Sequence, residues 1–504
     1  MRKVLFFTLE MQGLQEASQL QAANECLAQG DEVLYLTCGH ALGFCNDNRK
    51  GNRLQCRFCK RRQLARTARY LQGQATIRSI DDYVTPQMAS QAEAMQFHFQ
   101  SMEDLKAITF EGIEIGYGAL SSYVSYTRDI EAPADHIRNY IEDLLRLQVR
   151  MILALKELIA SFKPSLIVFH NGRFAEYKPL LGFARKLGID FLCTENILLG
   201  NGKRYQDNYP NGIPQNVADR DAHMKAIWTG APDKEQRVQV ARSFFENRRN
   251  AKFAGDTIYV KDQKLGTLPA DWDKTKENIV IFNSSEDEFF AIGSDSGASA
   301  VFQSQLEGIR AIVGHYASDT SKHFTLRVHP HLKGLPFAYH QDLYKLNYPN
   351  LTVIPADSVV SSYTLMDAAS KIIVFGSTMG VESAYWRKPV INLAFAIYNQ
   401  MDVVYLPKDT DELWHLIDTP QLQPKNPDNA LPYGYFYMTT NRPQLDTVDD
   451  LCDRRTLTLL GNRYTYHSGY RLLGSEHLYG IWRALMYRFE GKVPGLSKYK
   501  TIPL

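Results

Sequence analysis

The chain has 504 residues, 44% of them hydrophobic and 22% charged, which is ordinary for a globular protein large enough for two or three domains. The formal net charge of +2 gives no overall field that would attract nucleic acid, so none is expected as a partner. No run of about 18 uncharged apolar residues occurs, and the sequence therefore predicts no membrane-spanning helix.

Strands and helices are predicted to alternate through the first half of the chain. Apolar runs at 4–9 and 32–38 flank a helical pattern at 14–28, and this spacing is typical of a β-α-β unit in a parallel sheet. Glu10 ends the first run without a small-residue cleavage site, so we expect a strand there rather than a signal peptide, and a cytoplasmic protein. Helix, strand, helix and strand then follow at 133–162, 165–170, 178–187 and 189–195.

The alternation restarts after a polar stretch. Residues 261–278 hold Gly, Pro and several charges, as expected of a linker between two domains. Further strands are predicted at 278–285, 323–330, 351–356, 371–377 and 389–394, with helices between them. These strands are continuous apolar runs, which is expected where helices cover both faces of a parallel sheet.

These patterns predict the α/β class with two Rossmann-like domains. The first domain is expected at 1–260 with a cysteine-rich insertion at about 39–130, and the second at 279–470. A predicted helix within 471–504 could pack back on the first domain. Ligands of open parallel sheets bind at the carboxyl ends of the strands, so polar residues at those positions matter most.

One such set follows a strand of the second domain. Arg327, His329 and His331 occupy alternate positions in RVHPH, so we expect their side chains to face one way. Three potential cations would suit a leaving phosphate or diphosphate, and His329 could protonate a phosphate oxygen. The plainer alternative is a structural histidine at a strand end.

A glycine turn follows a second strand of that domain. Gly376, Ser377 and Thr378 precede a predicted helix, where hydroxyls and free N–H groups suit a phosphate. The turn matches neither GxxxxGK[ST] nor GxGxxG, so a simple capped turn is the alternative. Glu382 could accept hydrogen bonds from ribose hydroxyls, or it could merely complement the helix dipole. Two serines that end another strand could also contact phosphate: Ser284 and Ser285.

These stretches together carry a family resemblance. RVHPH at 327–331 and FGSTMGVESAYWRKPVINL at 375–393 resemble the C-terminal donor domain of GT-B glycosyltransferases that build bacterial surface polymers. The likeness is greatest to capsule-polysaccharide biosynthesis proteins of the Kdo-transferase type, and it extends to CDP-glycerol glycerophosphotransferases and HP-motif sialyltransferases. It covers roughly 279–395.

The resemblance implies a GT-B arrangement in which two domains face a cleft, and it implies roles for residues. His329, Ser377 and Thr378 would contact the donor phosphate, and Glu382 the nucleotide. The implied reaction moves a sugar from a nucleotide-activated donor, cytidine-type favoured and UDP possible, to a surface glycan or glycolipid. It is expected to invert the anomeric centre and to need no metal or other cofactor.

Two alternatives stay open for the function. One is an enzyme similar to UDP-sugar 2-epimerases, which share a related two-domain fold. The other is a non-catalytic component of a polysaccharide assembly complex that binds nucleotide-sugar or lipid. Either reading is compatible with the same polar strand ends.

An inverting transfer also needs a base on the acceptor side, which we expect in the first domain. Glu10 and His170 are the preferred catalytic candidates because both follow predicted strands. Asn171, Arg173 and Glu195 are expected to bind the acceptor, and Arg173 would suit an acidic one. Ordinary polar residues at strand ends are the alternative for each.

The predicted insertion contains four of the seven cysteines. Cys38, Cys45, Cys56 and Cys59 follow the spacing C-x6-C-x10-C-x2-C, and the last pair has zinc-knuckle spacing. One interpretation is a structural zinc site. The alternatives are unliganded thiols and, with less support from the spacing, an iron–sulfur cluster.

The same insertion carries a run of cations. Nine basic residues lie between 49 and 69 without one acidic residue: Arg49, Lys50, Arg53, Arg57, Lys60, Arg61, Arg62, Arg66 and Arg69. A solvated charged face is the plain interpretation. An anionic membrane surface fits better with polymer synthesis at the inner membrane, where the protein would be peripheral.

Overall fold

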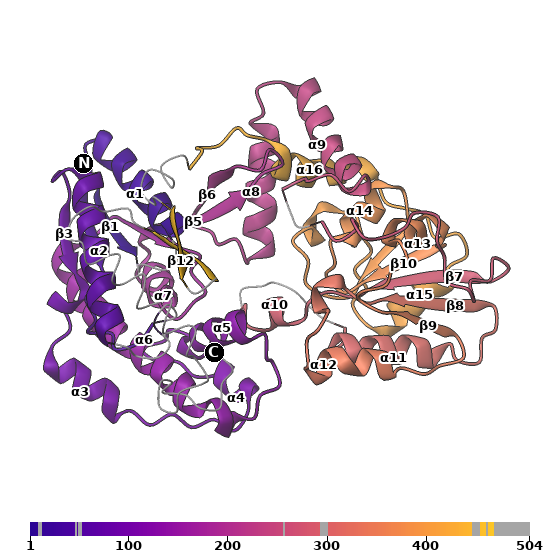
Figure 1. Ribbon diagram of the computed structural model, residues 1–504, viewed down its shortest axis with the longest axis horizontal. Coiled ribbons are helices and arrows are strands. Elements are labelled where there is room, and N and C mark those ends of the chain that lie inside the picture. Colours follow the sequence, from indigo (N-terminus) through magenta and orange to yellow (C-terminus); the bar gives the residue numbers. More distant parts are fainter. Residues whose placement is uncertain are drawn as a thin grey trace. The chain divides into compact units, whose positions relative to one another are not determined.

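The computed structural model describes residues 1–8, 13–45, 48, 53–255, 258–292, 301–445, 454–459 and 462–467 (Figure 1). The chain divides into two compact units. The first unit comprises 1–196, 204–213 and 443–504, and the second comprises 197–203 and 214–442. Each unit is built on its own sheet.

The first unit contains a six-stranded sheet in the order β3-β2-β1-β4-β5-β6. Its strands are β1 (Lys3–Thr8), β2 (Glu32–Thr37), β3 (Thr76–Ser79), β4 (Leu166–His170), β5 (Asp190–Leu198) and β6 (Arg204–Pro210). The pairs among β1 to β5 are parallel. The helices are α1 (Gly13–Ala28), α2 (Arg53–Leu71), α3 (Pro86–Ala94), α4 (Met102–Lys106), α5 (Ile115–Thr127), α6 (Ala134–Phe162) and α7 (Lys178–Leu187).

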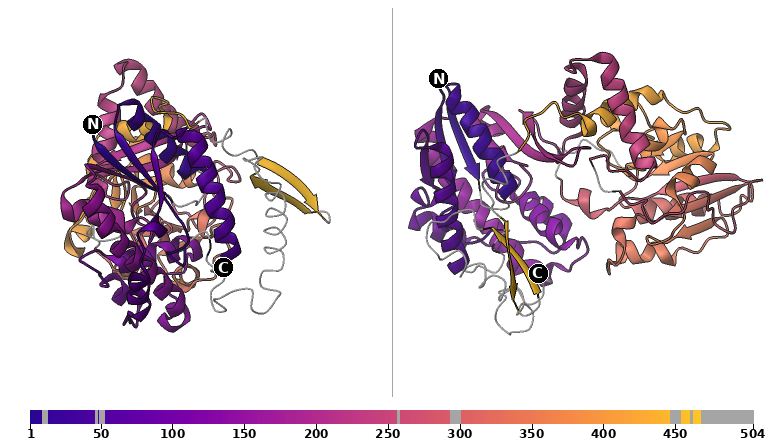
Figure 2. Two further views of the ribbon diagram at one scale, coloured as in Figure 1. Left: turned by 90° about the vertical axis from the view of Figure 1, so that its left-hand side faces the viewer. Right: turned by 45° about the horizontal axis from the view of Figure 1, so that its top comes forward.

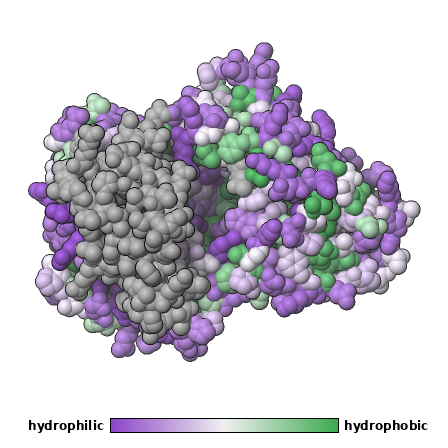
Figure 3. Space-filling view, viewed as in Figure 1, coloured by the Kyte–Doolittle hydropathy of each residue, from purple (hydrophilic) through white to green (hydrophobic). Residues whose placement is uncertain are grey.

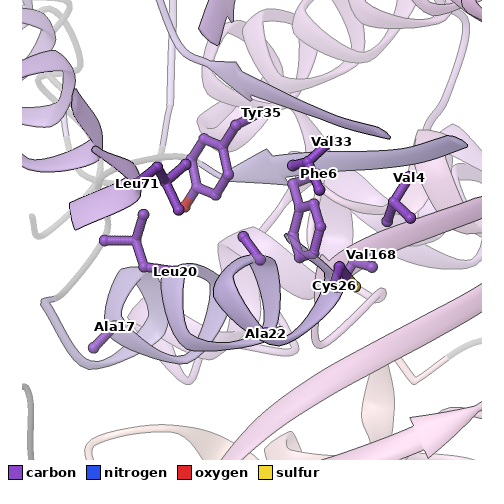
Figure 4. Packing of buried hydrophobic residues seen from close by; sticks show 11 residues of the cluster. Val4, Phe6, Ala17, Leu20, Ala22, Cys26, Val33, Tyr35, Leu71 and Val168 are labelled. Carbon is purple, nitrogen blue, oxygen red and sulfur yellow. The ribbon is translucent and has the colours of Figure 1, made fainter. Parts of the chain in front are cut away.

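The core of this unit forms between α1 and the middle of the sheet. Phe6 of β1 stacks on Tyr35 of β2 with ring centroids 5.8 Å apart, and Leu20 of α1 belongs to the same buried cluster (Figure 4). The right-hand view of Figure 2 shows α1 along the sheet. Strands β1 and β2 are buried at every position but the first, which confirms the expectation from their continuous apolar runs.

The second unit contains a five-stranded parallel sheet in the order β11-β10-β7-β8-β9. Its strands are β7 (Glu277–Phe282), β8 (Lys322–Arg327), β9 (Leu351–Ile354), β10 (Lys371–Val374) and β11 (Val390–Asn392). Its helices are α8 (Val217–Thr229), α9 (Lys234–Arg249), α10 (Asp287–Phe290), α11 (Gln305–His315), α12 (Ala338–Gln341), α13 (Ser362–Ala368), α14 (Met379–Tyr385), α15 (Thr410–Asp418) and α16 (Leu431–Met438).

The strand order of this sheet fixes which helices cover which face. The chain moves one way from β7 to β9 and the other way from β9 to β11, so right-handed crossovers place the intervening helices on opposite faces. Figure 1 shows α11 and α12 on one side and α13 and α14 on the other. The predicted α/β class with two parallel, Rossmann-like sheets is confirmed.

The unit boundaries differ from the predicted domains. Helices α8 and α9 belong to the second unit, because α9 packs on α16 through Phe244, whose ring lies 5.5 Å from those of Tyr433 and Tyr437. The expected linker, 261–278, also belongs to the second unit. The expected insertion at about 39–130 lies within the first unit, and its β3 adds a strand to the sheet by pairing with β2.

Two further predictions concern a C-terminal helix and the absence of a membrane-spanning helix. The helix expected within 471–504 lies outside the described residues. Two antiparallel strands that were not predicted, β12 (Arg454–Leu459) and β13 (Asn462–His467), form a separate ladder. Among the described residues, no helix combines the length and apolar composition that crossing a bilayer requires. Hydrophilic residues cover much of the visible face of the second unit in Figure 3.

Candidate functional site

A cavity opens in the second unit at the carboxyl ends of β7, β8 and β10. Five residues singled out from the sequence line it: Arg327, His329, Ser377, Thr378 and Glu382. They come from two separate segments, 327–329 and 377–382, and the parallel sheet brings them together because its strands end at one edge.

His329 is held by main-chain contacts on both sides. Its N–H donates to Asn283 Oδ1 at 2.9 Å, and its ring Nδ1 accepts the N–H of His331 at 3.2 Å. A main-chain N–H can only donate, so Nδ1 must be an acceptor and the neutral ring carries its proton on Nε2. The half-buried imidazole therefore has Nε2–H as its donor.

The predicted alternation of Arg327, His329 and His331 is wrong. Strand β8 ends at Arg327, and the chain turns into a 3-10 helix over Pro330–Leu332. His331 is exposed and its Nδ1 lies 2.7 Å from the hydroxyl of Tyr259. Because Pro330 starts the new helix, the two-residue period of the strand ends before it can align the three side chains.

Arg327 is buried and stabilises the lining of the cavity through hydrogen bonds. Only 2% of the residue is exposed, and its guanidinium donates to the carbonyls of Val328 at 3.2 Å, Ser358 at 3.1 Å and Pro355. Burial lowers its pKa to about 10, so it stays charged at neutral pH. Its predicted role as a direct phosphate ligand is thus replaced by one that fixes the loop after β9.

The glycine turn is fixed by residues beneath it. Gly376 has φ of +75°, and a Cβ there would collide with the carbonyl oxygen of Phe395, so only glycine fits. Its N–H donates to Asn392 Oδ1 at 3.0 Å, and the Tyr398 hydroxyl donates to the carbonyl of Ser377. Gly376 itself shapes the turn without lining the cavity.

Glu382 is the most buried charge of the site. None of it is exposed, and its Oε1 accepts from Arg248 Nε at 2.9 Å while its Oε2 accepts from the Tyr363 hydroxyl. Burial and then the carboxylate raise the pKa of Tyr363, so the phenol remains a donor. Both partners line the cavity. The carboxylate that was expected to accept hydrogen bonds from ribose hydroxyls therefore already accepts them from two protein groups.

Sequence reasoning missed Arg248 and Tyr363. They lie 134 and 19 positions from Glu382, in α9 and α13, so no local motif connects the three. Arg248 adds a positive charge to the lining of the cavity. Two guanidinium groups and one carboxylate give a net charge of +1 with neutral His329 and +2 with protonated His329. The cavity therefore favours an anionic ligand.

The predicted phosphate contacts of Ser284 and Ser285 are not supported. Both serines are buried and outside the described cavity lining. Ser284 exchanges two hydrogen bonds of 3.0 Å with Gln305, and the Ser285 hydroxyl donates to Asp287 at 2.7 Å. Asn283, the residue before them, reaches the cavity instead.

The first unit brings together three of its predicted site residues. His170 ends β4, and its Nε2 lies 3.8 Å from Glu195 Oε2 on β5, while Asn171 Nδ2 donates to Glu195 Oε1. Burial lowers the pKa of His170, and the nearby Glu195 opposes that shift. Arg173 stacks its guanidinium 4.8 Å from the Phe174 ring centre. Glu10 lies outside the described residues.

The cysteines do not assemble a metal site in this conformation. Within the part of the chain that the structure describes, no three Cys, His, Asp or Glu side chains converge on one point as metal ligands. Cys38 is half-buried, and burial raises its pKa to about 12. The Cys56 sulfur accepts from Asn48 Nδ2 at 2.9 Å. The arrangement does not fit the predicted zinc site at Cys38, Cys45, Cys56 and Cys59.

Comparison with known proteins finds similarity in fold. No protein-family model and no curated protein matches the chain. Thermosulfurimonas dismutans KpsC, named a beta Kdo 2,4 transferase, is 14% identical with a TM-score of 0.35 over 54% of this chain and 79% of its own. UDP-GlcNAc 2-epimerase from Neisseria meningitidis is 11% identical with a TM-score of 0.27 over 88% and 97%.

A third solved structure, the glycosyltransferase SnogD from Streptomyces nogalater, is 13% identical with a TM-score of 0.24 over 89% of this chain and 98% of its own. Each unit of this chain holds a Rossmann-like sheet of its own. Transferases and an epimerase appear side by side among these matches, so they assign no reaction to this chain.

Replacing Arg248 by Met should leave the Glu382 carboxylate buried without its cation. We expect a loss of about 3–5 kcal/mol in the free energy of unfolding of the second unit. Urea unfolding followed by tryptophan fluorescence measures it. The double variant Arg248→Met, Glu382→Gln should lose less, because no buried charge remains.

The control for this prediction is Arg242→Met on the same helix, where the exposed side chain should cost under about 0.5 kcal/mol. Equal losses for Arg248→Met and Arg242→Met would show that the buried ion pair does not support the unit.

Proposed function

We propose that the protein is a glycosyltransferase that binds a nucleotide-activated sugar in the cavity of the second unit. One observation carries the proposal: His329, Ser377 and Thr378, which the motif resemblance assigns to the donor phosphate, line one cavity with net positive charge. A phosphate or diphosphate is the part of an activated sugar that such a lining would bind.

The proposed reaction breaks the bond between the anomeric carbon and a phosphate oxygen of the donor. An acceptor hydroxyl oxygen forms the new bond to that carbon, and its proton passes to a base. The electron pair of the broken bond stays on the phosphate oxygen. His329 Nε2–H and the hydroxyls of Ser377 and Thr378 would stabilise that charge by hydrogen bonds. A His329 that is also protonated on Nδ1, which gives up the hydrogen bond from the His331 N–H, could transfer its Nε2 proton. These groups could supply the stabilisation without a metal.

The proposed donor is a nucleotide-sugar, with cytidine favoured, and the proposed acceptor is a surface glycan or glycolipid. For the acceptor's proton we propose His170 as the base, with Asn171 and Glu195 around it. Support comes from burial, which lowers the pKa of His170 and so keeps the imidazole neutral and able to accept a proton.

His329→Ala should reduce transfer from CMP-, CDP- or UDP-activated sugars by about 10²–10⁴-fold if the histidine acts as an acid. His329→Gln separates this role from simple hydrogen bonding, because its amide can still donate near the Nε2 position. Full loss in both variants supports proton transfer, and rescue by Gln supports a hydrogen-bond donor. Rates are measured by release of free nucleotide.

The control is His98→Ala, an exposed histidine of the first unit, which should leave the rate unchanged. Wild-type rates in both His329 variants would remove the cavity from the proposed mechanism. Epimerisation of a UDP-sugar without acceptor would instead establish the epimerase alternative, and nucleotide binding without any turnover would establish a binding component.

The pH dependence of transfer tests the proposed base. A base works above its pKa, and burial puts the pKa of His170 below the ordinary 6.5, so the acid limb of kcat/KM should lie below pH 6.5. Glu195→Gln removes the charge that raises this pKa, so it should move the limb further down. An acid limb that stays fixed in Glu195→Gln and persists in His170→Gln would assign it to another group.

Two cations of α2, Arg57 and Arg61, are exposed. We propose that they help the cationic run at 49–69 bind anionic phospholipid. Arg57→Glu, Arg61→Glu should weaken sedimentation with phosphatidylglycerol vesicles, and added salt should weaken wild-type binding.

The matched control reverses the same amount of charge at two exposed lysines elsewhere, Lys234→Glu and Lys274→Glu. If both double variants bind the vesicles equally, α2 is not the contact.

A further inference from the structure

A segment after the last residue of α9 is fixed to the second unit. The N–H of Lys264 donates to the Val359 carbonyl at 2.8 Å, and the N–H of Gly266 donates to Thr364 Oγ1 at 2.9 Å. Lys264 also forms a parallel bridge with Val360. These main-chain contacts hold 258–266 against the start of α13, so the segment is a wall rather than a free linker.

The side chains of this wall line the cavity and differ in chemistry from the groups that are expected to contact phosphate. Ile258, Tyr259 and Val260 are half-buried and line the cavity together with Gln263. Apolar and aromatic side chains with surface left exposed can cover the face of a flat ring, as nucleobase sites require. The same cavity thus offers cationic groups for phosphate and apolar side chains for a base.

The amide of Gln263 has a fixed orientation. Its Oε1 accepts the main-chain N–H of Ser362 at 2.8 Å, and that N–H can only donate, so the oxygen cannot exchange places with the nitrogen. The amide nitrogen donates to the Tyr259 carbonyl over a long 3.4 Å. Among the described residues, the NH₂ group makes no other hydrogen bond. Gln263 therefore presents its amide nitrogen as a donor to a ligand in the cavity.

We propose that the wall at 258–263 holds the nucleobase and that Gln263 is a specificity-determining residue for it. This inference rests on the proposed function. Cytosine has two adjacent acceptors, N3 and O2, whereas uracil has an N3–H between its two carbonyls. A donor amide meets both cytosine acceptors favourably, but beside a uracil carbonyl it faces the N3–H as well. Gln263 therefore favours cytosine.

The test compares dissociation constants of CMP, UMP and ribose 5-phosphate by calorimetry. Wild-type protein should bind CMP about tenfold more tightly than UMP, the size expected of one good polar contact to a base edge. Gln263→Met removes the donor and should bring the CMP to UMP ratio near one. Ribose 5-phosphate has no base, so its affinity should not change.

Gln263→Glu is the second variant, because its carboxylate can still accept from Ser362 and so keeps the wall in place. Its charge weakens every phosphate ligand alike, but the ratio should invert toward UMP, whose N3–H the carboxylate can accept. A ratio unchanged in both variants, with nucleotides still bound, overturns the role of Gln263 alone. Failure of all three ligands to bind wild-type protein overturns the proposed function as well.

Discussion

A buried carboxylate organises the second unit. Glu382 has no exposure to water, and an uncompensated charge in such a place would cost several kcal/mol. Arg248 and Tyr363 neutralise it and satisfy both of its oxygens. Because these partners come from α9 and α13, one interaction ties three helices together around the cavity. The same ion pair explains why α9 belongs to the second unit.

The phosphate-facing turn depends on a comparable layer of support. Gly376 can adopt its left-handed conformation only without a side chain, and Asn392 and Tyr398 hold the turn from below. His329 is fixed in the same way by Asn283 and by the N–H of His331. The groups that would meet a ligand are therefore positioned before it arrives, which lowers the entropy that binding must lose.

The cavity combines the kinds of group that a nucleotide would match. Positive charge and hydroxyls line it, and the wall at 258–263 contributes apolar surface with one oriented amide. A segment that composition describes as a linker thus becomes part of the site. Its Gly, Pro and charges allow a flexible chain, but main-chain hydrogen bonds to the loop before α13 and to α13 itself hold it in place.

The sequence by itself determined the two α/β sheets, because continuous apolar runs can be satisfied only where helices cover both faces of a parallel sheet. It also determined that His329, Ser377 and Thr378 would meet, since strand ends of one parallel sheet share an edge. The partners of Glu382, the inward turn of Arg327 and the free donor of Gln263 were decided only by the tertiary structure. Each depends on a contact between residues distant in the chain, and local periodicity holds no information about which distant group will satisfy a buried charge or amide.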